Sequence, residues 1–246
     1  MSNSSRKKEI GSSSDVRNLV VVLGDQLSLE LDAFRSFDPE LDAVWMAESA
    51  AEAKHVWSHK QRIALFLSAM RHFRAELETN GIRVFYTELE ENKDSKGIVE
   101  LLEQFLEDRA VSDSILMTEP GEWRLKKGFR DLATRISVPL RMREATSFLC
   151  SKEDFKKWAE GRKQLRMEYF YREMRKRNGI LMDGDAPTGG EWNFDSSNRA
   201  SFAKSGPEAV PSPARFKPDS ITREVMELVE KKFGSHPGKL DTFAWS

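Results

Sequence analysis

Short runs of apolar residues alternate along the chain with segments whose apolar residues recur every three or four positions. The clearest run covers residues 19–23 (LVVVL) and leads directly into Gly24, Asp25 and Gln26. A short, continuously apolar, β-branched run that ends in turn residues is typical of a strand buried on both faces of a parallel sheet. We therefore predict a first strand here, with the Gly24–Asp25 turn at its carboxyl end.

Further strands and helices follow in alternation. Four strands are predicted over residues 43–46 (AVWM), 82–87 (IRVFYT), 114–118 (SILMT) and 138–143 (VPLRMR). Helices are predicted directly after the first strand and over residues 50–79, 97–109 and 126–135, where apolar residues share one helical face. This alternation predicts an α/β fold with a doubly wound parallel sheet.

The character of the chain changes after about Phe148. Residues 151–177 predict a charged helix, and residues 152–177 hold ten Lys or Arg against five Asp or Glu. Aromatic residues are interleaved with these charges: Phe155, Trp158, Tyr169, Phe170 and Tyr171. Two interpretations stay open, a surface that meets nucleic acid and a solvated helix that packs its aromatic side chains on the sheet.

The last third of the chain contains a long segment that is rich in Gly, Pro, Ser and Asn, over residues 183–218. A loop of this length is either functional or a linker. One amphipathic helix is predicted after it, over residues 221–233. Because a linker and one helix cannot bury their own apolar surface, this ending resembles the start of a second domain.

The predicted domain organisation has four parts. Residues 1–17 form a polar, disordered tail, and residues 18–147 form the α/β domain. Residues 148–186 form a helical connector, and residues 187–246 form an interdomain loop with the first helix of a truncated C-terminal domain.

Composition narrows the class of protein. The 246 residues carry 39 Lys or Arg and 40 Asp or Glu, so net charge favours no particular partner. The single cysteine, Cys150, cannot form an intrachain disulfide or supply a four-cysteine metal site. No apolar run approaches the roughly 18 residues of a membrane span. The polar N-terminus lacks a signal-peptide core, so we expect a soluble, cytoplasmic protein.

Acidic residues follow three of the predicted strands. Asp25 follows the first, Glu48 the second, and Glu119 and Glu122 a later one, while Glu52 lies one helical turn beyond Glu48. Ligands of parallel α/β sheets bind beyond the carboxyl ends of the strands. We therefore expect these acids to accept hydrogen bonds from a sugar-like or heteroaromatic ligand. A hard metal ion is an alternative, but the acids lack a fixed ligand spacing.

His55 and His59 have the i, i+4 spacing of a zinc-binding pair. The intervening residues Val56, Trp57 and Ser58 provide no general base of the H-E-x-x-H type. No nucleophile and base pair is evident, so we predict neither a metal site nor catalytic residues.

Six motifs carry a resemblance to a known family. They are LGDQLS (23–28), QRIA (61–64), SAMRHF (68–73), TEPGEWR (118–124), MEYFYREMR (167–175) and GGEWNFDSSNR (189–199). In this order they resemble the N-terminal half of the iron–sulfur bacterial cryptochromes and photolyases, the deoxyribodipyrimidine photolyase-related proteins. The resemblance extends over nearly all of the chain from about Asn18.

The resemblance implies a light-dependent function. In the family, the α/β domain holds the antenna chromophore 6,7-dimethyl-8-ribityllumazine. A helical C-terminal domain holds FAD, a 4Fe–4S cluster and lesion DNA, typically with a (6-4) photoproduct. The cysteines of the cluster and the helices that bind FAD are missing from this sequence. We therefore expect neither cofactor to bind this chain, and DNA to bind only together with a C-terminal domain.

The family motifs also imply site residues. Together with the strand-end acids, the expected chromophore contacts are Gly24, Asp25, Glu48, Glu52, Phe66, Gly121 and Glu122. Ala47 occupies a position where the family can carry a cysteine, and Arg199 belongs to the interdomain loop that lies near DNA in the family.

Two hypotheses remain. The first is a photolyase-related chain whose repair activity requires a missing C-terminal half. The second is a stand-alone, non-catalytic α/β module that binds a lumazine- or flavin-like ligand. The genomic sequence beyond Ser246 would distinguish them, and a metal-assisted hydrolase is a distant third.

Overall fold

The chain divides into two compact units in the computed structural model. The sheet unit comprises residues 1–145 and 215–246, and the insert unit comprises residues 146–214. The described residues are 16–89, 96–195, 199–207, 211–212 and 214–241.

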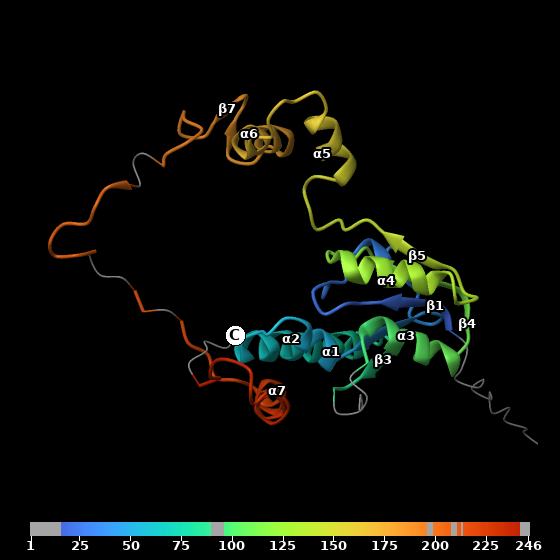
Figure 1. Ribbon diagram of the computed structural model, residues 1–246. Helices are drawn as coiled ribbons and strands as arrows, with labels where there is room; N and C mark the ends of the chain where they lie inside the picture. The colour runs from blue at the N-terminus through green and yellow to red at the C-terminus, as the bar shows by residue number, and fades with distance from the viewer. Residues whose placement is uncertain (1–15, 90–95, 196–198, 208–210, 213, 242–246) are drawn as a thin grey trace, which may run out of the picture. The chain divides into compact units, whose positions relative to one another are not determined.

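Five parallel strands form the sheet (Figure 1). They are β1 (Val16–Val21), β2 (Ala43–Ala47), β3 (Val84–Thr87), β4 (Val111–Thr118) and β5 (Leu140–Arg143), and their spatial order is β3-β2-β1-β4-β5. The chain runs outward from β1 to β3 and then returns to place β4 on the other side of β1. The direction of winding therefore reverses between β1 and β4, which confirms the predicted doubly wound sheet.

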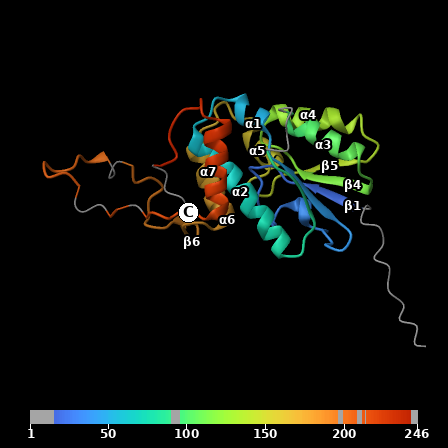
Figure 2. The same ribbon diagram turned by 90° about the horizontal axis from the view of Figure 1, so that it is seen from below.

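Alternate residues of the first strand enter two different cores. Leu19 and Val21 pack in a cluster with α3 (Ile98–Glu107) and α4 (Trp123–Ala133). Val20 packs in a second cluster with α2 (Lys60–Thr79). Because side chains of a strand point alternately to the two faces, helices cover both faces of the sheet (Figures 1 and 2). This explains why β1 is apolar without interruption.

Two helix predictions in this unit require correction. The predicted helix 50–79 is two helices, α1 (Ala50–His55) and α2, because the chain becomes extended at Val56 and restarts at the N-cap residue His59. The predicted helical connection after β1 is a single 3-10 turn, Asp32–Phe34. Its apolar residues are buried against the second cluster, so tertiary burial rather than helical pattern determines this segment.

A third apolar cluster joins α2 to the last helix, α7 (Ser220–Lys232). Ile63, Ala64 and Leu67 of α2 pack there with Val225 and other residues of α7. The sequence placed this helix at the start of a second domain, whereas in the structure it packs within the sheet unit. The predicted domain boundaries themselves stay predictions.

The insert unit contains two short helices, α5 (Lys152–Ala159) and α6 (Met167–Asn178), where the sequence predicted one helix. Gly161 follows the end of α5 at φ +71°, a left-handed conformation that suits glycine and terminates helices. A small hairpin of β6 (Met182–Asp183) and β7 (Ala186–Pro187) follows. Across both units, the described residues include no helix that is long and apolar enough to cross a membrane.

One ion pair fastens the start of α7 to α2. His72 Nε2 lies 2.5 Å from an oxygen of Asp219, the N-cap residue whose side chain also accepts a hydrogen bond from Thr222 N at 2.8 Å. The Thr222 and His72 contacts lower the pKa of Asp219 to about 2. Burial lowers the pKa of His72, but hydrogen bonds to Asp219 and the Ser68 carbonyl outweigh it and raise this pKa above its usual value.

This pair predicts a pH-dependent stability. Because the folded pKa of His72 is raised, its contribution is full below about pH 6.5 and is lost as the pH rises through the raised value. We expect the free energy of unfolding of His72→Gln, measured by urea denaturation, to fall less between pH 6 and pH 8 than that of the unmodified chain.

Asp219→Asn is the matched variant, because Asn still caps a helix but lacks the charge. It should reduce the same loss by a similar amount. An unchanged pH dependence in both variants would contradict the assignment.

Candidate functional site

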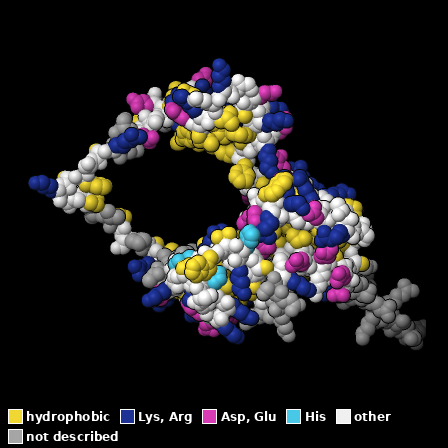
Figure 3. Space-filling model, viewed as in Figure 1, with side chains coloured by type: hydrophobic (Ala, Val, Ile, Leu, Met, Phe, Trp, Pro, Cys, Tyr) yellow, Lys and Arg dark blue, Asp and Glu magenta, His cyan; other side chains and the backbone are white. Residues whose placement is uncertain are grey.

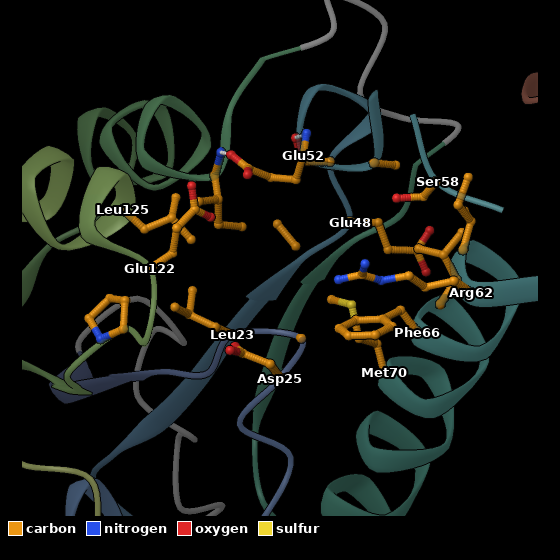
Figure 4. Close-up of a pocket in the computed structure, with 18 of the residues that line it drawn as sticks. Leu23, Asp25, Glu48, Glu52, Ser58, Arg62, Phe66, Met70, Glu122 and Leu125 are labelled. Carbon is orange, nitrogen blue, oxygen red and sulfur yellow. Dashed lines mark hydrogen bonds between the residues drawn. The ribbon is translucent and has the colours of Figure 1, made fainter. Parts of the chain in front are cut away.

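A cavity of about 390 Å³ lies at the carboxyl edge of the sheet (Figure 4). Residues that follow β1, β2 and β4 line it, so it spans the point at which the winding of the sheet reverses. Ligands of open α/β sheets bind in this position. Helices α1, α2, α3 and α4 complete the lining, and all of these elements belong to the sheet unit.

Most of the wall is apolar. The hydrophobic side chains of the lining come from the turn after β1 and from α2, α3 and α4: Leu23, Ile63, Phe66, Leu67, Met70, Ile98 and Leu125. Pockets for small organic ligands combine such a wall with a few polar groups. The exposed ring of Phe66 lies beneath the guanidinium of Arg62, whose Cζ is 5.7 Å from the ring centroid.

Gly24 and its neighbours form the first wall. A β-carbon at Gly24 would lie 2.9 Å from Met70 Sδ, so the turn approaches α2 closely because it has no side chain there. Gln26 donates from Nε2 to the carbonyls of Thr118 and Glu119, at 3.4 and 3.2 Å, and thereby joins the turn to the end of β4. Asp25 lines the cavity and forms no side-chain hydrogen bond with another described residue.

Glu48 is fully buried, and its carboxylate is occupied by protein groups. Arg71 donates from Nε and Nη2 at 2.7 and 3.0 Å, Tyr86 from its hydroxyl at 2.8 Å, and Leu89 from its backbone at 2.9 Å. Burial and the charge of Glu48 raise the pKa of Tyr86, which therefore stays protonated. Glu48 lines the cavity, but its carboxylate acts as a structural anchor between β2, β3 and α2.

Arg124 connects two other acids of the lining. Its guanidinium donates to both oxygens of Glu52 and, from Nε at 2.7 Å, to Oε1 of Glu122. The hydrogen bonds to Glu52 and then Glu122 raise the pKa of Arg124 despite an opposing effect of burial. This acid–arginine–acid bridge holds two carboxylates, from α1 and from the N-cap position of α4, beside one cavity.

All seven expected contact residues line this cavity, and five of them follow strand ends (Gly24, Asp25, Glu48, Gly121 and Glu122). Figure 4 shows Glu52 and Asp25 on opposite sides, with Glu122 facing Phe66 across the space. A β-carbon at Gly121 would meet no atom within 4 Å, so there is room for a side chain at this position. Ala47 lines the cavity as well.

Sequence reasoning missed two arginines that organise these acids, Arg71 and Arg124. Both lie within the quoted motifs, SAMRHF and TEPGEWR. For Arg124, the available signal in the sequence was its position two residues after Glu122.

The motifs have a counterpart among known proteins. The family model described as deoxyribodipyrimidine photo-lyase-related protein matches residues 20–245. The chain belongs to this family. The predicted resemblance is therefore confirmed at the level of the family.

Two relatives of this photolyase-related chain differ in length. A (6-4) photolyase of Agrobacterium fabrum is 41% identical over 229 residues, which are 93% of this chain and 44% of that protein. The chain thus spans less than half the length of that relative. A protein of Acanthamoeba polyphaga mimivirus is 22% identical over 196 residues, which are 75% of this chain and 94% of the viral protein.

His55 and His59, which have the spacing of a zinc-binding pair, lie in different structural elements. His55 ends α1, whereas His59 is the N-cap residue of α2 and accepts a hydrogen bond from Gln61 N at 3.1 Å. Over the described ranges, no group of three or more His, Cys, Asp or Glu residues is arranged to hold a metal ion.

Part of the aromatic set of the insert unit forms its own small core. Phe155, Trp158 and Phe170 pack together with ring centroids 4.9–5.6 Å apart. Tyr169 and Tyr171 are exposed, and hydrophobic side chains also gather on the visible surface of this unit (Figure 3). Arg199 is exposed, and its contact with DNA stays a prediction.

The buried position of Glu48 predicts a large effect of substitution on stability. We expect Glu48→Ala to lower the free energy of unfolding by about 3–5 kcal/mol, because it leaves Arg71 largely buried without its main partner. Urea denaturation would measure this loss.

Glu88→Ala is the matched control, because Glu88 contacts the same arginine at 3.8 Å but is partly exposed. It should cost about 1 kcal/mol or less. Equal losses in the two variants would contradict the anchoring role of Glu48.

Proposed function

We propose that the sheet unit binds an antenna chromophore of the lumazine type, 6,7-dimethyl-8-ribityllumazine. The observation that carries this proposal is the convergence of all seven expected residues on one cavity at the switch point of the sheet. Family membership supports the same conclusion, since the expected contacts other than Glu48 came from the family resemblance.

The residues of the cavity suit such a ligand. Its volume of about 390 Å³ lies within the range of small-molecule sites, roughly 300–1,000 Å³. The apolar wall from α2 and Leu125 can cover a heteroaromatic ring and exclude water from it. Asp25, Glu52 and Glu122 can accept hydrogen bonds from ring N–H groups and ribityl hydroxyls, and ionised carboxylates accept strong ones.

The proposal has a wider functional setting. When bound, the chromophore would absorb light and transfer the energy to a flavin. We propose that this occurs in a photolyase-related protein for light-dependent DNA repair, with (6-4) photoproducts as the lesion. The name of the Agrobacterium relative supports this choice of lesion. The role of this chain's residues is to bind and orient the chromophore.

A second candidate is a stand-alone, non-catalytic binding module. The mimivirus relative favours it, because the matched region covers 94% of that protein's own length. Chromophore binding is common to both candidates, so a binding measurement tests the shared part first.

We expect the purified chain to shift the absorption band of added lumazine and to bind it saturably. Glu122→Ala should weaken binding roughly tenfold, because a hydrogen bond to a charged group is lost. Glu103→Ala is the matched control, since Glu103 forms a similar pair with Arg135 at 2.8 Å and does not line the cavity. An unchanged spectrum with no measurable affinity would refute the antenna assignment.

A steric variant tests the location of the site. Gly121 lines the cavity, and a β-carbon there would meet no atom within 4 Å, so Gly121→Leu adds a bulky side chain to the lining without a clash. We expect it to weaken lumazine binding at least tenfold while the unfolding temperature changes little. Full affinity in a folded Gly121→Leu protein would show that the ligand binds elsewhere.

A further inference from the structure

The cavity differs from a phosphate-binding site in the element that follows β1. Dinucleotide-binding folds place a helix N-terminus at this turn, and its free N–H groups bind the pyrophosphate. Here β1 leads through Gly24 and Asp25 to the 3-10 turn Asp32–Phe34, with no α-helix before β2. The usual phosphate position of this fold is therefore absent.

Two neighbouring helix N-termini already have carboxylates of the protein beside them. At α3, Glu100 accepts a hydrogen bond from Gly97 N at 2.8 Å, and Glu52 Oε1 lies 3.5 Å from Ile98 N. At α4, the N-cap residue is Glu122, whose carboxylate is held by Arg124. Because a helix N-terminus attracts anions, the carboxylates of Glu100 and Glu52 occupy the position at α3 that a ligand phosphate would otherwise prefer. At α4 the carboxylate of Glu122 forms no capping hydrogen bond with the helix, but its negative charge repels a second anion there.

The first helix of the lining is also capped from within. Ser49 Oγ accepts a hydrogen bond from Glu52 N at 3.2 Å at the start of α1 and donates to the Lys96 carbonyl at 2.7 Å. The backbone of α1 at this position is therefore satisfied by the protein itself.

The side chains of the lining have an excess of negative charge. Among the described residues that line the cavity, there are four carboxylates (Asp25, Glu48, Glu52 and Glu122) and one guanidinium, Arg62. With the partner residues Arg71 and Arg124 included, carboxylates still outnumber guanidiniums four to three. Arg71 and Arg124 are already paired with Glu48, Glu52 and Glu122, so neither is freely available to a ligand.

Arg62 is the one lining residue that attracts a phosphate. It lies on the α2 wall above Phe66, across the cavity from Glu122 (Figure 4). A phosphate inside a cavity of about 390 Å³ lies within a Debye length, about 8–10 Å, of several carboxylates wherever it sits. With Arg62, Arg71 and Arg124 all counted, the carboxylates of the site still exceed the guanidiniums by one, so the net charge of the site repels a phosphate.

We propose that the cavity selects a heterocycle whose ribityl chain ends in a free hydroxyl and rejects the corresponding 5′-phosphate. Glu52 and Glu122, held by Arg124, are the specificity-determining residues. This inference rests on the proposed binding of a ribityl heterocycle and adds the phosphorylation state of the ligand.

The test compares two ligands that differ only in one phosphate, 6,7-dimethyl-8-ribityllumazine and its 5′-phosphate. Absorption and fluorescence titrations of the purified chain at low salt should give a dissociation constant about tenfold or more higher for the phosphate. Because salt screens exposed charges, the ratio should become smaller at high ionic strength.

Variants assign the discrimination to the two acids. The double variant Glu52→Gln with Glu122→Gln keeps side-chain size but removes both charges, so the ratio of the two affinities should fall about tenfold or to unity. The ratio isolates the phosphate effect, because a lost contact to the ribityl chain weakens both ligands equally. Glu103→Gln, at the pair with Arg135 away from the cavity, should leave the ratio unchanged.

The outcomes separate the two claims. Equal or tighter binding of the phosphate by the unmodified chain would overturn the specificity and leave chromophore binding intact. An unchanged ratio in a folded double variant would overturn the role of Glu52 and Glu122. No binding of either ligand would overturn both the specificity and the proposed function.

Discussion

The buried ion pair of Glu48 and Arg71 is the interaction on which the site depends. The carboxylate follows β2, receives both Arg71 nitrogens from α2, and also accepts from Tyr86 of β3 and from Leu89 N. A buried charge is tolerated when its hydrogen-bonding capacity is used in this way. The pair fixes α2 against the sheet edge, and Met70, next to Arg71, then closes against Gly24. The shape of the cavity therefore depends on the Glu48–Arg71 ion pair.

The strands could be predicted because a strand that is buried on both faces consists almost entirely of apolar residues. Every residue of β2 and most of β1 are buried, which removes the polar positions of half-exposed strands. The helix breaks were harder, because apolar periodicity continues across them. The side chain of His59 caps the start of α2 by accepting a hydrogen bond from Gln61 N, and Gly161 ends α5 in a left-handed conformation. These local events outweigh a pattern that spans twenty or more residues.

The positions of the site residues could be predicted from the sequence, whereas the hydrogen-bond partners of the acidic residues could not. Strand ends of a parallel sheet converge on one edge, which brought Asp25 and Glu122 to the same cavity. The partners of the acids depend on tertiary geometry, since Arg71 lies 23 positions from Glu48 and Arg124 lies 72 positions from Glu52. Without those contacts, Glu48 and Glu52 appear equivalent in the sequence. In the structure both line the cavity, but Glu48 is fully buried and paired with Arg71, whereas Glu52 is partly exposed and paired with Arg124.

The fold alone does not determine which ligand this edge of the sheet receives. Doubly wound sheets often bind phosphates because helix N-termini point at the switch point. In this chain the helix after β1 is missing, and Glu52 and Glu122 lie beside the first turns of α3 and α4. Arg124 holds both carboxylates in place by hydrogen bonds. At α3, the backbone dipole that in other folds attracts a ligand anion here lies beside the carboxylates of Glu52 and Glu100.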